Sequence, residues 1–199
     1  MKKIVLGTAL LAAVSCGASA HFSGGYGELD VGYVSTSGKI AKTSNKPKVS
    51  YNQSGFGLFG KVGGGCNHSG VYVGGEFQFG RAFSKKEYKS SPKSNLARQW
   101  NVGAAVRVGG HLDNDVLLYG RLGIEGDTYS FLRQGAKDRG TVLTYSLVPG
   151  VGANMMITHN MYVSAEVDYG VSFKRTSPAA SKASNFNSTR ATIGIGYKF

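Results

Sequence analysis

Residues 189–199 read Thr-Arg-Ala-Thr-Ile-Gly-Ile-Gly-Tyr-Lys-Phe, and their side chains alternate strictly between two faces of an extended strand. The apolar face carries Ala191, Ile193, Ile195, Tyr197 and Phe199. The other face carries polar side chains or none. This pattern fits a soluble sheet that packs its apolar face into a core. It also fits a closed barrel in lipid, whose apolar face points outward. The other end of the chain helps to separate these two alternatives.

The amino terminus is typical of an export signal. Two lysines precede an apolar run, residues 4–14, and a small-x-small cleavage site follows at Ala18 and Ala20. The apolar run is too short to span a bilayer. The expected division of the chain is therefore a signal peptide over residues 1–20 and a single domain over residues 21–199.

A lipoprotein signal, with Cys16 acylated and first in the processed chain, is the alternative. The residues before Cys16 lack the leucine that such a signal carries three positions earlier. Cleavage after Ala20 would instead leave Cys66 as the only remaining cysteine of two. We therefore expect no intramolecular disulfide in the processed chain.

Period-two alternation recurs along the rest of the chain. No later apolar run of about 18 residues could form a transmembrane helix. The 30 glycines, 4 prolines, 11 tyrosines and 10 phenylalanines suit many strands joined by turns. Eight strands are expected, over residues 25–35, 55–63, 70–82, 99–109, 116–128, 141–154, 161–173 and 189–199.

The connections between the expected strands differ in length. Residues 64–69, 110–115 and 155–160 form short connections, and the other four are longer. Bacterial transmembrane barrels have short periplasmic turns and long outer loops. Pro149 lacks the N–H that a strand interior requires, so we expect a bulge there.

Charge placement favours the membrane barrel. Seven of the eleven acids fall on the face opposite the apolar side chains: Glu28, Asp30, Glu76, Glu125, Asp127, Glu166 and Asp168. Five cations share that face: Lys61, Arg107, Arg121, Arg190 and Lys198. A basic residue in mid-bilayer would cost about 2–4 kcal/mol on the lipid face. The soluble alternative, a lipocalin-like barrel, would have to bury seven carboxylates in an apolar interior.

The sequence therefore predicts an all-β fold, an eight-stranded antiparallel up-and-down transmembrane barrel. Such a barrel is just wide enough for side chains to fill its interior. We expect the charges to form a network that plugs the lumen, surrounded by Tyr26, Tyr72, Gln78, Asn101 and Tyr119.

Four short stretches resemble the small outer-membrane barrels grouped as OmpA-like or OmpX/Ail-like. They are residues 118–123 (Leu-Tyr-Gly-Arg-Leu-Gly), 148–152 (Val-Pro-Gly-Val-Gly), 162–169 and 194–199. The resemblance implies a location in the bacterial outer membrane. It also implies that the barrel-assembly machinery reads the terminal strand through Tyr197 and Phe199. A place in the aromatic girdle at the membrane interface is the alternative role for these two residues.

The long connections are strongly basic. Counted with Arg81 at their rim, they hold sixteen basic residues and two acids, Glu87 and Asp138. The candidate anion-binding residues are Lys39, Lys42, Lys46, Lys48, Lys85, Lys86, Lys89, Lys93, Arg98, Arg133, Lys137, Arg139, Lys174, Arg175 and Lys182. Their field would attract polyanions. The nearest partner is lipopolysaccharide; sulfated glycans or acidic host proteins are the alternative, and export makes nucleic acid a poor partner.

Catalysis is not expected. All four histidines, His21, His68, His111 and His159, fall at the expected periplasmic end, so a His-dependent site for lipid chemistry at the outer rim is unavailable. A weak metal site at that end is less expected than solvated side chains, and no cofactor motif is present. A structural envelope protein is the leading hypothesis. An adhesin or resistance factor is the alternative, followed by a small porin and a lipid A-modifying enzyme.

Overall fold

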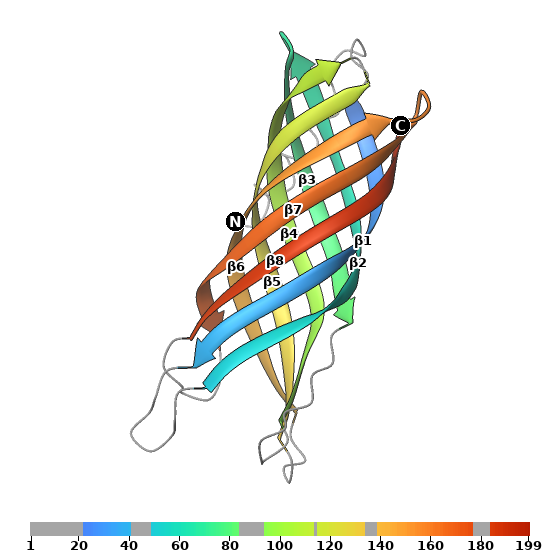
Figure 1. Ribbon diagram of the computed structural model, residues 1–199. Helices are drawn as coiled ribbons and strands as arrows, with labels where there is room; N and C mark the ends of the chain where they lie inside the picture. Colours follow the sequence, from blue (N-terminus) through green and yellow to red (C-terminus); the bar gives the residue numbers. More distant parts are fainter. Residues whose placement is uncertain (1–21, 41–48, 84–93, 114, 134–138, 177–183) are drawn as a thin grey trace, which may run out of the picture.

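The computed structural model describes residues 22–40, 49–83, 94–113, 115–133, 139–176 and 184–199. These residues form eight strands (Figure 1). The strands are β1 (Gly24–Ile40), β2 (Val49–His68), β3 (Val71–Phe83), β4 (Ser94–Asp113), β5 (Val116–Arg133), β6 (Arg139–Met156), β7 (Met161–Thr176) and β8 (Ser184–Lys198). None of the described residues forms a helix long and apolar enough to cross a membrane.

The strands close into a barrel. Each strand pairs antiparallel with its neighbours in the chain, and β1 pairs with β8 to complete the ring. All of them wrap obliquely around one axis, and the carboxy terminus lies at the end with the short turns (Figure 1). The prediction of an eight-stranded antiparallel up-and-down barrel is confirmed.

The two faces of the wall differ as the alternation predicts. Apolar side chains on the outward face are exposed, among them Leu29, Val102 and Ile193. Along β3, exposed or half-buried positions alternate with buried ones from Val71 to Phe83. The inward positions are filled largely by buried polar and charged side chains. The wall therefore presents an apolar surface outward and a polar one inward.

The strands extend beyond their predicted bounds at the end opposite the short turns, which we term the outer end. β1 continues to Ile40 and β2 begins at Val49, with Ile40 and Val49 paired. Residues expected in loops, such as Lys39 and Arg98, are therefore in strands. Apolar alternation stops where both faces meet water, but the hydrogen bonds between strands continue. The sequence pattern therefore ends before the strand does.

The opposite end, the short-turn end, also has shorter connections than predicted. Between β2 and β3 only Ser69 and Gly70 form the turn, with φ angles of 52° and 83°. Positive φ at both central positions is the geometry that fits the twist of a two-residue hairpin. Gly64 and the residues after it, expected in a turn, continue β2 as far as His68.

Pro149 does not form the expected bulge. It lies within β6 and pairs with Leu122 of β5. Neither Val148 nor Pro149 pairs with β7, yet the register is the same on both sides of this gap. The β6–β7 register shifts instead between Tyr145 and Ser146. Because proline has no N–H, it interrupts the ladder toward one neighbour without displacing the strand.

Apolar clusters lie at both ends of the interior. At the short-turn end, Phe22 folds inward over the barrel and packs with buried residues of four strands: Tyr26, Tyr72, Leu117, Tyr119 and Tyr162. Toward the outer end, Phe59 packs with Val34 and Ala82. Cys66 lies near the end of β2. That it is the only cysteine of a chain cut after Ala20 stays a prediction.

Candidate functional site: the charged interior of the barrel

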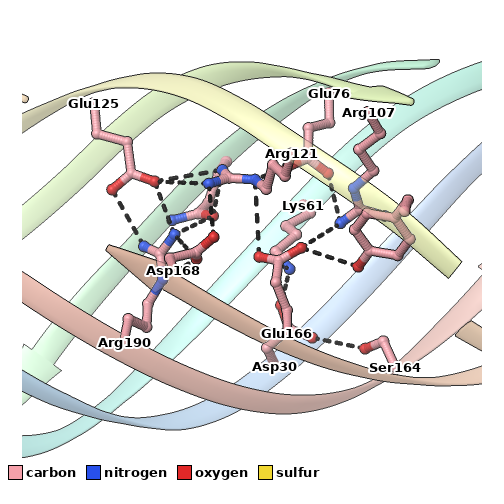
Figure 2. A network of polar contacts seen from close by, with 12 residues as sticks. Asp30, Lys61, Glu76, Arg107, Arg121, Glu125, Ser164, Glu166, Asp168 and Arg190 are labelled. Atoms are coloured by element: carbon pink, nitrogen blue, oxygen red, sulfur yellow. Dashed lines mark hydrogen bonds and ion pairs between the residues drawn. The ribbon is translucent and has the colours of Figure 1, made fainter. Parts of the chain in front are cut away.

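Lys61 lies at the centre of the half of the charge network nearer the short-turn end. Its Nζ lies 3.0 Å from Glu28 Oε1, 2.8 Å from Asp30 Oδ2 and 3.0 Å from Glu166 Oε1. These residues come from β1, β2 and β7, and all are almost completely buried. Figure 2 shows Lys61, Asp30 and Glu166 turned toward one another. One ammonium therefore contacts three carboxylates that come from two other strands.

Arg107 of β4 joins this group from the other side of the lumen. Its Nη2 lies 2.7 Å from Glu76 Oε2 and 3.2 Å from Glu166 Oε2. Its guanidinium carbon lies 4.5 Å from the ring centroid of Tyr119 and 5.4 Å from that of Tyr26. Aromatic faces attract a cation in this position. Arg107 is thus held by both ion pairs and rings.

Tyrosine hydroxyls supply further donors to the same carboxylates. Tyr26 donates to Glu76 Oε2 at 3.0 Å, and Tyr119 donates to Glu166 Oε2 at 3.0 Å. Tyr162 donates to Glu28 Oε2 at 2.9 Å. Buried carboxylates need several donors to offset the loss of water. The tyrosine rings at the short-turn end therefore join the apolar cluster to the charge network.

Arg121 of β5 connects the two halves of the network. Its Nε lies 2.6 Å from Glu76 Oε1, and its Nη1 lies 3.3 Å from both Glu125 Oε1 and Asp168 Oδ1. Its Nη2 donates to Gln78 Oε1 at 3.1 Å. The planar fork of arginine, with five donors, suits such multiple recognition. A lysine could not reach these acceptors in the same geometry.

Arg190 of β8 forms the outer half of the network with Glu125 and Asp168 (Figure 2). Its Nη2 donates to Glu125 Oε1 at 2.8 Å and its Nε donates to Asp168 Oδ2 at 2.8 Å. Its guanidinium carbon lies 4.9 Å from the ring centroid of Phe59. Asn101 extends this half by donating to Glu125 Oε2 and Asp127 Oδ1, at 2.8 and 2.9 Å.

β6 contributes space instead of charge. Two of its inward positions are glycines, Gly150 and Gly152. A Cβ at Gly152 would lie 2.5 Å from the ring of Tyr119, and one at Gly150 would collide with the carboxylate of Asp168. Side chains from the neighbouring strands therefore occupy the volume in front of β6.

All eleven predicted lumen residues of the network are inward and buried. Lys198, also predicted there, is half-buried near the short-turn end. Phe59, Tyr162 and Ser164 were missed, although they share the parity of the charged residues on their strands. Ser164 donates to Asp30 Oδ1 at 3.2 Å. The alternation of inward and outward positions along each strand would have predicted that these three side chains point inward. Phe22 precedes β1, so this alternation makes no prediction for it.

The outer basic residues are described only in part. Lys39, Arg98, Arg133, Arg139, Lys174 and Arg175 lie in the outer parts of strands, where the backbone alone is described. Lys42, Lys46, Lys48, Lys85, Lys86, Lys89, Lys93, Lys137 and Lys182 lie outside the described residues. Arg81 is described and is exposed on the outward face of β3. Tyr197 and Phe199 are exposed at the short-turn end, whereas Ala18 and Ala20 lie outside the described residues.

The described histidines lie at the short-turn end. His68 ends β2, His111 lies near the end of β4, and His159 lies between β6 and β7. His21 lies outside the described residues. Within the described part of the chain, no three His, Cys, Asp or Glu side chains are arranged to hold a metal ion.

The model of the outer membrane protein beta-barrel domain family matches residues 6–199. The chain belongs to this family. It is an outer-membrane protein, so the short-turn end is periplasmic and the outer end faces the exterior. The predicted family and location are confirmed.

Solved barrels of similar fold come from several bacteria. Neisserial surface protein A has 16% identity and a TM-score of 0.59, with 89% of this chain and 98% of that chain covered. Ail, the attachment invasion locus protein of Yersinia pestis, has 17% identity and a TM-score of 0.47, covering 88% and 99%. The outer membrane protease OmpT of Escherichia coli has 10% identity and a TM-score of 0.48, covering 88% and 96%. No curated protein matches the chain.

Proposed function

We propose that this outer-membrane barrel has a structural role in the envelope and binds the anionic groups of lipopolysaccharide through its basic outer segments. These segments are the four connections between strands at the outer end together with the strand ends that flank them. The observation that carries the proposal is the separation of charge. The inward cations and carboxylates pair with one another, whereas the outer segments, with Arg81, hold sixteen basic residues and two acids. A field of one sign at that end attracts polyanions and weakens in salt.

The lumen is proposed to be plugged. Lys61, Arg107, Arg121 and Arg190 each contact two or more carboxylates in the narrow interior. Phe22 and its neighbours occupy the periplasmic mouth. An ion would have to displace these contacts in order to pass. Recordings from planar bilayers are expected to show no large, steady conductance, and such a conductance would replace this proposal with the small-porin alternative.

The basic outer segments can be tested by substitution. Lys39, Lys42, Lys46 and Lys48 are exchanged together for serine, and binding to immobilised lipopolysaccharide is measured at increasing salt. We expect weaker binding and a smaller salt dependence than in the wild type, with unchanged folding. A matched control exchanges four neutral residues of the same segment, Ser37, Thr43, Ser44 and Asn45, for alanine. Binding that is unchanged by the lysine substitutions and by added salt would contradict the proposal.

An adhesin or resistance factor is the alternative function. The same positive segments fit sulfated glycans or acidic host proteins, since both are polyanions. Whole-cell binding of a deletion strain and its complemented strain to such ligands discriminates the two roles. Adhesion predicts loss of binding in the deletion strain. The envelope role predicts unchanged adhesion with greater sensitivity of the deletion strain to detergents.

A non-enzymatic role is part of the proposal. The described histidines lie at the periplasmic end, away from the outer leaflet, and this placement disfavours a lipid A-modifying enzyme with a His-dependent site. The predicted assembly role of Tyr197 and Phe199 and the predicted signal peptide are likewise parts of the proposal.

A further inference from the structure

Arg81 points out of the barrel, unlike the three arginines whose side chains are described in the lumen. It lies on β3 between Phe79 and Phe83, on the face whose side chains are exposed to lipid. The arginines at 107, 121 and 190 are all inward and buried. An arginine that faces lipid at the bilayer midplane would cost about 2–4 kcal/mol, a cost that falls to roughly 0–1 near the interface.

The position of Arg81 along β3 puts it at the outer interface. Val71 is the first residue of β3 after the periplasmic turn, and Arg81 follows ten residues later. At about 3.3 Å per residue and a tilt of roughly 40–45°, these two residues are separated by about 23–25 Å along the barrel axis. The apolar band of such barrels is about 25 Å tall. Arg81 therefore lies at the level where acyl chains end and headgroups begin.

Two exposed aromatic rings flank the guanidinium. Its central carbon lies 5.6 Å from the ring centroid of Phe83 and 5.5 Å from that of Trp100 on β4. No carboxylate among the described residues pairs with Arg81. The two rings pack against the guanidinium and hold its orientation. Its N–H edges are available to an oxyanion with two acceptor oxygens.

We propose that Arg81, Phe83 and Trp100 form a binding site for the phosphate of an anionic lipid headgroup in the outer leaflet. The acyl chains of that lipid lie against the exposed side chains below the site, Phe79 and Val102. The site deepens the proposed function, on which it rests, because it locates one phosphate contact on the barrel wall. Lipid A phosphates and phosphatidylglycerol share this chemistry.

Trp100 makes the site directly observable because it is the only tryptophan in the chain. The protein is folded into phosphatidylcholine vesicles that contain a small fraction of acyl-brominated phosphatidylglycerol, and bromine quenching of Trp100 is recorded. The reference is the same fraction of brominated phosphatidylcholine. We expect at least twofold greater quenching by the anionic lipid. Arg81→Gln is expected to abolish this excess, and Arg81→Lys to retain part of it.

Unlabelled lipid A identifies the source of the phosphate. Loss of the excess on adding lipid A assigns the site to lipid A, whereas an unchanged excess assigns it to glycerophospholipid. Both outcomes support the site. Equal quenching by the two brominated lipids, or an excess that survives Arg81→Gln, would overturn it.

The four-lysine serine variant separates this site from the proposed function. If that variant keeps the excess quenching but loses binding to lipopolysaccharide, both proposals stand. If the four-lysine variant keeps both the excess quenching and lipopolysaccharide binding, the outer segments are not the binding surface, and the Arg81 site stands. If it loses the excess together with Arg81→Gln, general electrostatic attraction explains the quenching and the Arg81 site fails.

Discussion

Arg107 and Tyr119 hold the same carboxylate from two sides. The Arg107 guanidinium carbon lies 4.5 Å from the Tyr119 ring centroid, its Nη2 lies 3.2 Å from Glu166 Oε2, and the Tyr119 hydroxyl donates to that same oxygen at 3.0 Å. The ring of Tyr119 thus positions the guanidinium of Arg107, and the hydroxyl of Tyr119 positions the carboxylate of Glu166. Tyr119→Phe separates these two contributions because it keeps the ring and removes the donor.

The Tyr119→Phe variant is expected to lower the free energy of unfolding by about 1–3 kcal/mol, because Glu166 loses a buried donor. Urea titrations in lipid vesicles, followed by Trp100 fluorescence, measure the change. Tyr169→Phe on the exposed outward face is the matched control and is expected to change stability by less than about 0.5 kcal/mol. Equal effects of the two variants would count against a specific role for the hydroxyl.

Lys61→Met should destabilise the barrel more strongly. Glu28, Asp30 and Glu166 would lose their shared cation. Breaking a buried pair by removing one partner costs about 3–5 kcal/mol. The same urea titration applies, with Lys39→Met at the outer end of β1 as the control. A small loss for Lys61→Met would show that water reaches these carboxylates.

Gly152→Ala tests the space that β6 provides. The new Cβ would lie 2.5 Å from the ring of Tyr119, so the ring must shift and the Glu166 hydrogen bond must lengthen. Overpacking of this kind costs about 1–3 kcal/mol. Gly75→Ala is the control, since a Cβ added at Gly75 would meet no atom within 4 Å. Equal stability of both variants would disprove the steric account.

Deleting Phe199 tests its role in assembly. The residue is exposed at the periplasmic end, and its N–H donates to Gly25 O at 3.0 Å. A recognition role predicts a large loss of folded protein in cells, while refolding of the purified protein in detergent remains near wild type. Heat-dependent mobility in gel electrophoresis measures both. A parallel loss in both settings would assign Phe199 to the stability of the barrel instead.

Most of the fold could be predicted from the alternation of apolar and polar residues, because every barrel strand has one face toward lipid and one toward the lumen. The same parity placed Glu28, Lys61 and Arg190 inside without any structure. It could not give their partners, because a pair such as Lys61 and Glu166 is set by barrel closure and strand stagger. Strand ends at the outer end were missed because Lys39 and Ser50 pair where no apolar face is required.

Closure of the ring by β1 and β8 has a consequence for how the protein enters the bilayer. Glu28 and Tyr162 meet across 134 residues of sequence, and Lys61 and Glu166 across 105. Until the final strand docks, many of these groups have only water as a partner. If the strands inserted one at a time, carboxylates without a paired cation would have to cross the hydrocarbon core. The network therefore favours a pathway in which the barrel closes as it crosses the bilayer, with the lumenal side chains hydrated until closure.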